Sequence, residues 1–479
     1  MQTNTLKPQK VFEYFSLLSA IPHGSGDMDG IAAFCENFAN EHGFKCIRDK
    51  DNNVIIFKNG TAGYEMCEPI ILQGHLDMVC QKTPESNIDF AKDGLDLYVD
   101  GDYLKAKDTT LGADNGIAVA IILAILDSND ISHPPIEAVF TTDEEIGMIG
   151  ARALDMSVLS GKRMINLDSE TENIVTVSCA GGSDFRVSIP IVRSTVQGTK
   201  ITLDIKGLQG GHSGVDIKNN RENANMIAGR VLNELTSKFD FGIISINGGD
   251  KSNAIPNRCI VELCVPSPNE FINSAKNCFD IIKNEIADRE GDFEALVLTD
   301  KTDKFNVFAN DIKEKIIYTL LCVPNGITEM SAEITGLVQT SLNLGILVTN
   351  DQNIILHFAL RSNKKSALLF LEQRLIAFFK NLDIKYETFG HYPPWEYRSV
   401  SPLRELYCDI YSSNFGENPK IVAIHAGLEC GVFDDGIKDL DCISIGPNLH
   451  DVHTVRERLS ISSTQKIYKI VVELLGKLK

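Results

Sequence analysis

Apolar and polar residues alternate along the first part of this chain in a pattern typical of buried strands separated by helices. The apolar runs 54–57, 68–72, 136–142 and 164–167 have the length of buried strands, and the material between them is largely helical. The run 115–126 is longer and strongly apolar, which favours a buried helix. Strands that alternate with helices predict a largely parallel sheet.

The pattern changes after the loop Cys179-Ala-Gly-Gly-Ser183. From here strands of alternating character are followed by helices and then by further strands, as in two sets that resemble split βαβ units. The expected strands are 185–191, 200–206, 242–247, 258–265, several across 327–360, and 383–388; the expected helices are about 220–237, 268–288 and 364–380.

The length of 479 residues is too great for one simple core, so more than one domain is expected. The segment Gly390-His-Tyr-Pro-Pro-Trp395 is rich in turn residues, and the pattern of the first part returns beyond it. We therefore expect residues 1–184 and 391–479 to form one α/β domain, with a mostly parallel sheet and helices on both faces. An inserted α+β domain at 185–390 would interrupt it.

Composition and charge exclude some classes of partner. Hydrophobic residues make up 43% and charged residues 23%, as in ordinary folded proteins. The net charge of −19 argues against nucleic acid or an anionic membrane as a partner, and an acidic surface more often serves solubility. The sequence has no apolar run of membrane-spanning length, no signal-peptide core and no Cys-x-x-Cys pair, so we expect a cytoplasmic protein with reduced cysteines.

Residues that suit metal binding follow four of the expected strands. In an α/β sheet the carboxyl ends of the strands form the ligand-binding edge, so side chains from these positions meet there. They are His75 and Asp77 after 69–72, Glu144 and Glu145 after 136–140, Asp168 after 163–167, and His450 and His453 after 442–446. On its own, the segment with His75 and Asp77 is equally well explained as a surface loop, and an isolated Glu144–Glu145 pair is better explained as an exposed acidic turn.

Asp114 adds a carboxylate that can bridge two cations, although a helix N-cap would also account for it. Two ions about 3.5–4 Å apart form a known hydrolytic arrangement. His75, Asp114 and Asp168 would hold one ion. Asp114, Glu145 and a histidine would hold the other, and spacing does not decide between His450 and His453. Imidazole and carboxylate donors suit zinc, manganese or cobalt.

Two neighbours of these ligands have separate expected roles. Adjacent residues of an extended chain point apart, so Glu144 can act as general base while Glu145 binds metal. Asp77 lies two residues after His75 and can accept a proton from its second ring nitrogen, which orients the ring.

Six motifs together resemble the dinuclear-metal aminopeptidase and carboxypeptidase clan, in its branch of aminoacyl-histidine dipeptidases. They are Gln73-Gly-His-Leu-Asp-Met-Val79, Thr110-Leu-Gly-Ala-Asp-Asn-Gly116, Thr142-Asp-Glu-Glu-Ile-Gly147, Asn166-Leu-Asp-Ser-Glu170, Gly210-Gly-His-Ser-Gly214 and His425-Ala-Gly-Leu-Glu-Cys-Gly431. The resemblance implies that His75, Asp114, Glu145, Asp168 and His453 bind metal, with Asp114 bridging. It favours His453 over His450 because His453-Thr-Val-Arg-Glu457 fits the family's His-Ser/Thr-x-x-Glu pattern.

The resemblance also implies residues that contact the substrate. His212 would stabilise the oxyanion, unless its glycine-rich segment is an ordinary loop. Asn253 and Arg361 would hold the substrate's backbone and carboxylate, with a solvated arginine as the alternative for Arg361. Glu429 would receive the free amino group, or else serve as a buried structural carboxylate.

The resemblance therefore implies a metallo-dipeptidase with two divalent ions. Zinc is the expected metal, and manganese and cobalt are the alternatives. Residues 1–184 and 391–479 would be its catalytic domain and 185–390 its lid. A water that bridges the metals, activated by Glu144, would cleave dipeptides with a free amino end, Xaa-His among them. The alternatives are an amidohydrolase for tripeptides or N-acyl amino acids, and a non-catalytic metal-stabilised binding protein. The lid strands would either form a homodimer edge or pack within the lid.

Overall fold

The computed structural model describes residues 5–479, and their packing divides the chain into two compact units. Unit 1 comprises the segments up to Ser178, Tyr397–Ala423 and Leu428–Lys479. Unit 2 comprises Cys179–Glu396 and Ile424–Gly427. The assignment of 1–184 with 391–479 as a catalytic domain and of 185–390 as a lid stays a prediction.

Unit 1 is built on a sheet whose strands follow the order β1-β2-β6-β3-β7-β21-β8-β20. The central strands β6, β3, β7 and β21 are parallel, while β1, β2 and β8 pair antiparallel at the sides. The elements are α1 (Gln9–Ser19), α2 (Asp29–Glu41), β1 (Lys45–Arg48), β2 (Val54–Lys58), β3 (Ile70–His75), β4 (Leu97–Asp100), β5 (Tyr103–Ala106), α3 (Ala113–Asp127), β6 (Ile136–Thr141), α4 (Ile149–Ala153), the 3₁₀ turn η2 (Met156–Val158), β7 (Arg163–Asn166), β8 (Ile174–Cys179), α9 (Pro402–Phe415), β20 (Lys420–Ile424), α10 (Glu429–Gly436), β21 (Asp441–Ser444), β22 (Leu449–His450), β23 (Arg458–Ser460) and α11 (Ile461–Lys477).

The apolar runs of the sequence become the core of unit 1. Every residue of β3 and β6 is buried, as expected for parallel strands covered on both faces. The helix expected at 115–126 is α3, which is apolar on all sides and buried almost throughout. α3 packs against β3 and α1, and α9 and α10 pack against β21. The expected α/β fold class is confirmed, with antiparallel strands flanking the parallel centre.

A small antiparallel sheet in the order β22-β23-β5-β4 accompanies the main sheet of unit 1. Its strands β22 and β23 bracket the loop that contains His453. The pairing of β23 with β5 ties this loop to the chain before α3.

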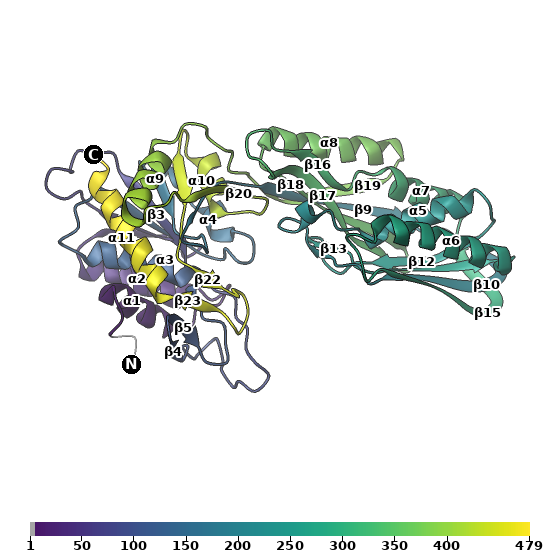
Figure 1. The fold of residues 1–479 in the computed structure, drawn as a ribbon, viewed down its shortest axis with the longest axis horizontal. Helices are drawn as coiled ribbons and strands as arrows, with labels where there is room; N and C mark the ends of the chain where they lie inside the picture. The colour runs from purple at the N-terminus through teal and green to yellow at the C-terminus, as the bar shows by residue number, and fades with distance from the viewer. Residues whose placement is uncertain (1–4) are drawn as a thin grey trace. The chain divides into compact units, whose positions relative to one another are not determined.

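Unit 2 is built on an antiparallel sheet in the order β15-β10-β14-β12-β17-β18-β9-β19, with β16 paired to β17. Helices α5 to α8 lie along one face of this sheet (Figure 1). The elements are β9 (Gly181–Pro190), β10 (Arg193–Lys206), β11 (Gly211–His212), the 3₁₀ turn η3 (Ile217–Asn219), α5 (Ala224–Thr236), β12 (Gly242–Gly248), β13 (Ala254–Ile255), β14 (Cys259–Val265), α6 (Pro268–Ile286), β15 (Glu294–Phe308), α7 (Asn310–Cys322), β16 (Gly326–Met330), β17 (Val338–Thr349), β18 (Asn353–Ser362), α8 (Lys365–Asn381) and β19 (Lys385–Tyr392).

The two predicted split βαβ sets are present as neighbours in one sheet. The run β10-α5-β12-β14-α6-β15 gives the spatial order β15-β10-β14-β12, which is that of a βαββαβ motif. The elements β9, α7, β17, β18, α8 and β19 give the order β19-β9-β18-β17, which repeats it. Alternation sets the two faces: Phe185, Val187 and Ile189 enter the core beneath the helices, while Asp184 lies on the other face.

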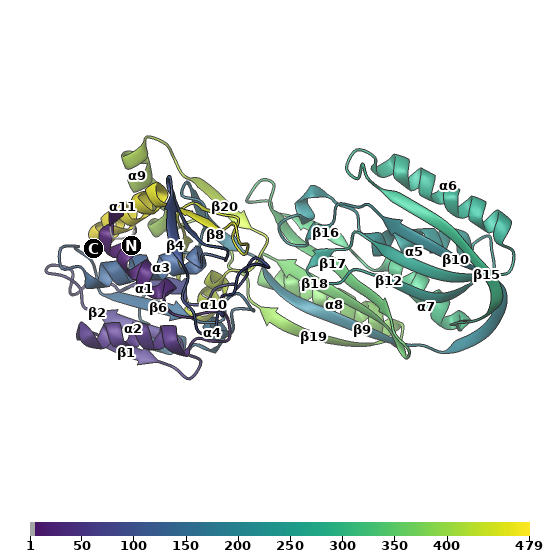
Figure 2. The ribbon, with the colours of Figure 1, turned by 90° about the horizontal axis from the view of Figure 1, so that it is seen from below.

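Three details of unit 2 differ from the sequence prediction. The strand β15 and the helix α7 were not predicted. β15 is charged around Asp300–Lys304 and mostly exposed, because it runs along one edge of the sheet (Figure 2). β19 continues to Tyr392, so the first three residues of the linker predicted at Gly390 are strand.

Within residues 5–479, the structure has no helix of sufficient length and apolarity to cross a membrane.

Candidate metal centre

Three neighbouring parallel strands of unit 1 deliver polar side chains to one edge of the sheet. His75 is the last residue of β3, and it lies opposite Thr141, the last residue of β6. Asp168 follows β7 by two residues. The Glu144–Glu145 pair follows β6 in a turn, in which the amide of Gly147 donates to the carbonyl of Glu144, so this pair is not extended as expected.

The carboxylate of Asp114, at the start of α3, lies between two histidines. Its Oδ1 is 3.3 Å from Nε2 of His75, which is also 3.5 Å from Oδ1 of Asp168. Its Oδ2 is 3.2 Å from Nε2 of His453, which is also 3.0 Å from Oε1 of Glu145. The two oxygens of one carboxylate thus face two separate donor groups, as a carboxylate that bridges two cations does.

The donor atoms fit divalent metal ions. Three groups have ligand atoms within 4.8 Å of one another: His75 with Asp114 and Asp168, His75 with Glu144 and Glu145, and Asp114 with Glu145 and His453. These groups, found among the described residues, contain imidazole and carboxylate but no thiolate. That inventory suits zinc, manganese or cobalt.

The tautomer of His75 is set by its own chain. Nδ1 of the fully buried ring lies 2.9 Å from the backbone carbonyl of Asp77, which can only accept, so Nδ1 carries the proton. Nε2 is then the ring nitrogen left to bind a metal, and it lies beside the carboxylates of Asp114 and Asp168.

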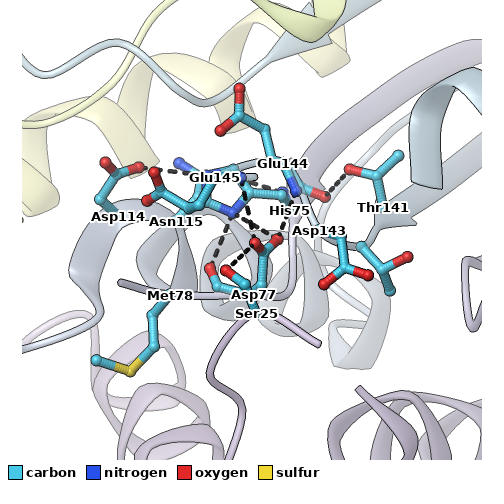
Figure 3. Close-up of polar contacts among 12 residues, drawn as sticks. Ser25, His75, Asp77, Met78, Asp114, Asn115, Thr141, Asp143, Glu144 and Glu145 are labelled. Carbon is cyan, nitrogen blue, oxygen red and sulfur yellow. Dashed lines mark hydrogen bonds and ion pairs between the residues drawn. The ribbon is translucent and has the colours of Figure 1, made fainter. Parts of the chain in front are cut away.

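The carboxylate of Asp77 holds the turn that carries the two glutamates (Figure 3). Its Oδ1 accepts the amide of Glu144 at 2.9 Å, and its Oδ2 accepts the amide of Glu145 at 3.2 Å and the hydroxyl of Ser25 at 2.8 Å. Oδ1 also lies 3.4 Å from Nδ1 of His75, farther than the backbone carbonyl does. Asp77 therefore links the histidine to the glutamate turn.

Glu457 holds the loop before Asp114 in a similar way. This buried carboxylate accepts the amides of Leu111 at 2.7 Å, Gly112 at 3.2 Å, Ala113 at 2.9 Å and Asp114 at 3.4 Å. Four backbone donors on one side chain fix the start of α3 and, with it, the position of the Asp114 carboxylate.

Charges in this cluster interact strongly. Burial raises the pKa of Glu144 well above its ordinary value and that of Asp168 to about 6. Hydrogen bonds to Asp114 and Glu145 raise the pKa of His453 to about 11. Burial alone would lower the pKa of His75, but its carboxylate neighbours raise it. Several carboxylates crowded at one buried place favour bound cations.

Comparison with known proteins identifies the family. The model of peptidase family M20/M25/M40 matches residues 71–477. The cytosol non-specific dipeptidase of Escherichia coli (strain K12) is 36% identical over 478 residues, which cover 99% of this chain and 98% of that protein. The chain belongs to peptidase family M20/M25/M40.

Solved structures agree with this assignment. The aminoacylhistidine dipeptidase of Vibrio alginolyticus superposes with a TM-score of 0.94 at 35% identity, over 100% of this chain and 98% of that one. The aminopeptidase PepT of Bacillus cereus ATCC 10987 superposes with a TM-score of 0.53 at 14% identity, over 99% of both chains, and shows the fold alone. This member of the M20/M25/M40 family is thus a peptide hydrolase.

Residue spacing did not decide whether His450 or His453 is the metal ligand, and the two lie in different surroundings in this M20/M25/M40 peptidase. His453 contacts Asp114 and Glu145, with which it forms one of the candidate metal-binding groups. His450 belongs to β22 and packs edge-on against Tyr103. The ligand role of His453, as the resemblance implies it, and those of the other candidate ligands stay predictions.

Glu429 is fully buried in unit 1. Its Oε2 accepts from Nε2 of Gln73 at 2.5 Å and from the hydroxyl of Thr141 at 2.6 Å. Asn166 donates in turn to Oε1 of Gln73 at 2.5 Å. This network braces β3, β6 and β7 just behind the donor cluster, which favours the structural alternative for Glu429 over contact with a substrate amine.

The remaining candidates lie in unit 2. The short pairing of β11 with β13 sets His212 opposite Ala254, and the carbonyl of Asn253 accepts the amide of Ser213 at 2.8 Å. His212 and Asn253 are therefore close neighbours in this unit. Arg361 lies on β18, where it lines a cavity together with Asn253.

Hydrogen bonds define the protonation of His212 in unit 2. Nδ1 of His212 accepts the amides of Gly214 at 3.3 Å and Val215 at 3.2 Å, so the proton of the neutral ring is on Nε2. Burial lowers the pKa of His212, and the nearby Arg361 lowers it further. His212 is thus a neutral donor through Nε2.

Several residues that support the site were not singled out from the sequence. Glu457 appeared only as part of the histidine motif, and Ser25, Gln73, Thr141 and Asn166 gave no separate signal. Each acts through a contact with a residue far along the chain, for example Ser25 with Asp77 and Gln73 with Glu429. Spacing within one segment carries no information about such pairs.

Proposed function

We propose that this chain hydrolyses dipeptides with a free amino end, using divalent metal ions held by His75, Asp114, Asp168, Glu145 and His453. The observation that carries the proposal is the Asp114 carboxylate, whose two oxygens face His75 and His453 separately. Two divalent ions fit two donor groups that share one carboxylate, and zinc is the metal that we propose first.

Bound divalent ions supply Lewis acidity, which polarises a peptide carbonyl and acidifies water. Glu144 supplies the base. Its side chain contributes to the donor group with His75 and Glu145, while its backbone is fixed by Asp77. Burial raises its pKa, which suits a carboxylate that takes a proton from the attacking water and returns it to the departing amine.

We propose that unit 2 supplies hydrogen bonds to the substrate. His212 can donate through Nε2 to the oxygen that becomes negative in the transition state. Asn253 would hold the peptide backbone, and the guanidinium of Arg361 would bind the carboxylate at the end of the dipeptide.

The substrate class follows the relatives. One is described as a non-specific dipeptidase and another as an aminoacylhistidine dipeptidase. We therefore propose dipeptides as substrates, those with histidine in second place among them. We also propose a cytoplasmic location, which accords with the first of these descriptions.

We further propose a homodimer that forms through unit 2. Light scattering of the purified chain tests this oligomeric state.

A panel of dipeptides, tripeptides and N-acyl amino acids tests the proposal. We expect turnover of dipeptides, loss of turnover on chelation, and recovery when zinc, manganese or cobalt is returned. Preferred cleavage of tripeptides or acyl amino acids would contradict the substrate class. Dipeptide turnover that survives complete removal of metal would contradict the role of metal.

A further inference from the structure

Arg361 lies in a polar cavity of unit 2. The cavity has a volume of about 480 Å³, and its lining includes Asp184, Asn253, Ala359, Arg361 and Tyr392. Only 9% of Arg361 is exposed, and its Nε has no hydrogen-bond partner within the described residues. A buried guanidinium with an unused donor is suited to an anionic ligand.

Tyr392 contacts this guanidinium directly. Nη1 of Arg361 donates to the hydroxyl oxygen of Tyr392 at 2.8 Å. Gly182 of β9 lies between them in the sheet, since it is opposite Arg361 on β18 and opposite Tyr392 on β19. Residues opposite one another in a ladder share a face, so both side chains meet above Gly182.

The glycine at position 182 leaves the space in which the two side chains meet. A Cβ added there would lie 2.5 Å from the hydroxyl oxygen of Tyr392 and 2.8 Å from the carbonyl of Leu360. Any larger residue would displace Tyr392 from Arg361. The contact therefore depends on a specific residue from each of three adjacent strands.

A phenol is a suitable partner for an arginine that must bind an anion. Burial raises the pKa of Tyr392, which keeps the hydroxyl neutral. A carboxylate in its place would neutralise the guanidinium and compete with the ligand. A neutral acceptor instead fixes one N–H of Arg361, while its charge and remaining donors stay available.

We propose that Tyr392 is a positioning residue whose hydroxyl orients Arg361 toward the carboxylate at the end of the dipeptide, in the space left by Gly182. This inference rests on the proposed function. It adds a residue that does not contact the substrate and acts only through Arg361.

The test compares Tyr392→Phe with Tyr386→Phe in the metal-loaded enzyme. Both tyrosines lie on β19, but Tyr386 stacks on Phe185, and no hydrogen bond of its hydroxyl is found among the described residues. The substrates are alanylhistidine and its C-terminal amide, which lacks the carboxylate. KM and kcat are measured for both substrates.

We expect Tyr392→Phe to raise KM for alanylhistidine about tenfold, with kcat changed less than twofold. KM for the amide should not change, and Tyr386→Phe should change neither substrate. Retained hydrolysis of the amide also shows that the variant is folded. Gly182→Ala should produce the same selective rise in KM.

An equal rise in KM for both substrates, or no rise for alanylhistidine, would overturn the proposal. Calorimetric binding of the same pair to Glu144→Gln enzyme, with and without Tyr392→Phe, separates this result from a failure of the proposed function. Dipeptide binding without turnover by the parent enzyme would defeat the function alone. Equal affinity of the two binding variants for alanylhistidine would defeat the inference alone.

Discussion

The backbone amide of Glu144 donates to Oδ1 of Asp77 at 2.9 Å, and this bond joins the end of β3 to the turn after β6. The same carboxylate lies 3.4 Å from Nδ1 of His75. One buried side chain thus sets the position of a candidate metal ligand and of the candidate base. Because both depend on Asp77, its removal should affect metal binding and catalysis together.

We predict that Asp77→Asn lowers kcat/KM by about 10- to 100-fold, because second-layer partners of metal-binding histidines have effects of that size. Metal affinity, measured by titration with a chelating indicator, should fall in the same variant. Asp155→Asn is the control, since Asp155 caps an exposed turn through the amide of Ser157. Wild-type turnover and metal affinity in Asp77→Asn would contradict this role.

Glu457→Gln tests the support of Asp114. The amide keeps one oxygen acceptor but brings an NH₂ group against backbone N–H donors that now contact the carboxylate. We expect metal affinity to fall at least tenfold, with most of the secondary structure retained. Metal content after dialysis and far-ultraviolet circular dichroism measure the two effects. Full metal occupancy in the variant would show that Glu457 does not position the ligand.

Glu429→Ala tests whether Glu429 is structural. The change leaves the buried amide of Gln73 and the hydroxyl of Thr141 without their acceptor, at about 1–3 kcal/mol for each group. We expect a melting temperature lower by several degrees, with KM for free-amino dipeptides changed less than threefold. A large rise in KM without loss of thermal stability would instead favour contact with the substrate amine.

His425 should make the stability of unit 2 depend on pH. Its Nδ1 donates to Oδ1 of Asn363 at 3.1 Å, and its Nε2 accepts from the hydroxyl of Ser341 at 2.7 Å. Burial, with Arg361 nearby, lowers the pKa of His425 from 6.5 to about 3. The folded state therefore prefers the neutral ring, and its contribution is complete above pH 6.5 and lost as pH falls toward 3.

Thermal melting between pH 7.5 and 5.0 measures this effect. The wild-type chain should lose more stability over that range than His425→Gln, whose amide can both donate and accept without titrating. Parallel curves for the two proteins would show that His425 does not contribute in this window.

The candidate metal-binding groups were largely predictable from the sequence, but the residues that support them were not. His75, Asp168 and the Glu144–Glu145 pair follow apolar strands, so the topology of a parallel sheet already brings them to one edge. The choice of His453 required a family motif, because both histidines lie in one loop. The hydrogen bonds of Glu457 join residues more than 340 positions apart, and spacing does not encode them.

The sequence predicted the interior strands of unit 2, but it did not predict the edge strand β15 or the end of β19. The strands β9 and β18 alternate regularly, because one face packs on the helices and the other is polar. β15 is an edge strand with charges on exposed positions and an irregular register near Thr199, so its pattern is not that of a buried strand. The turn residues Gly390 and Pro393 predict a linker around Tyr392, but the structure places Tyr392 at the end of β19.

In the proposed function, Glu144 moves the proton in a metal-dependent hydrolysis of dipeptides. Glu144→Gln removes the base while the donors His75, Asp114, Asp168, Glu145 and His453 remain. Measured on one preparation, metal content and dipeptide turnover give the most direct test. We predict wild-type metal content with kcat lower by about 10²- to 10⁴-fold. Unimpaired hydrolysis by the metal-loaded variant would contradict the role of Glu144 as the base.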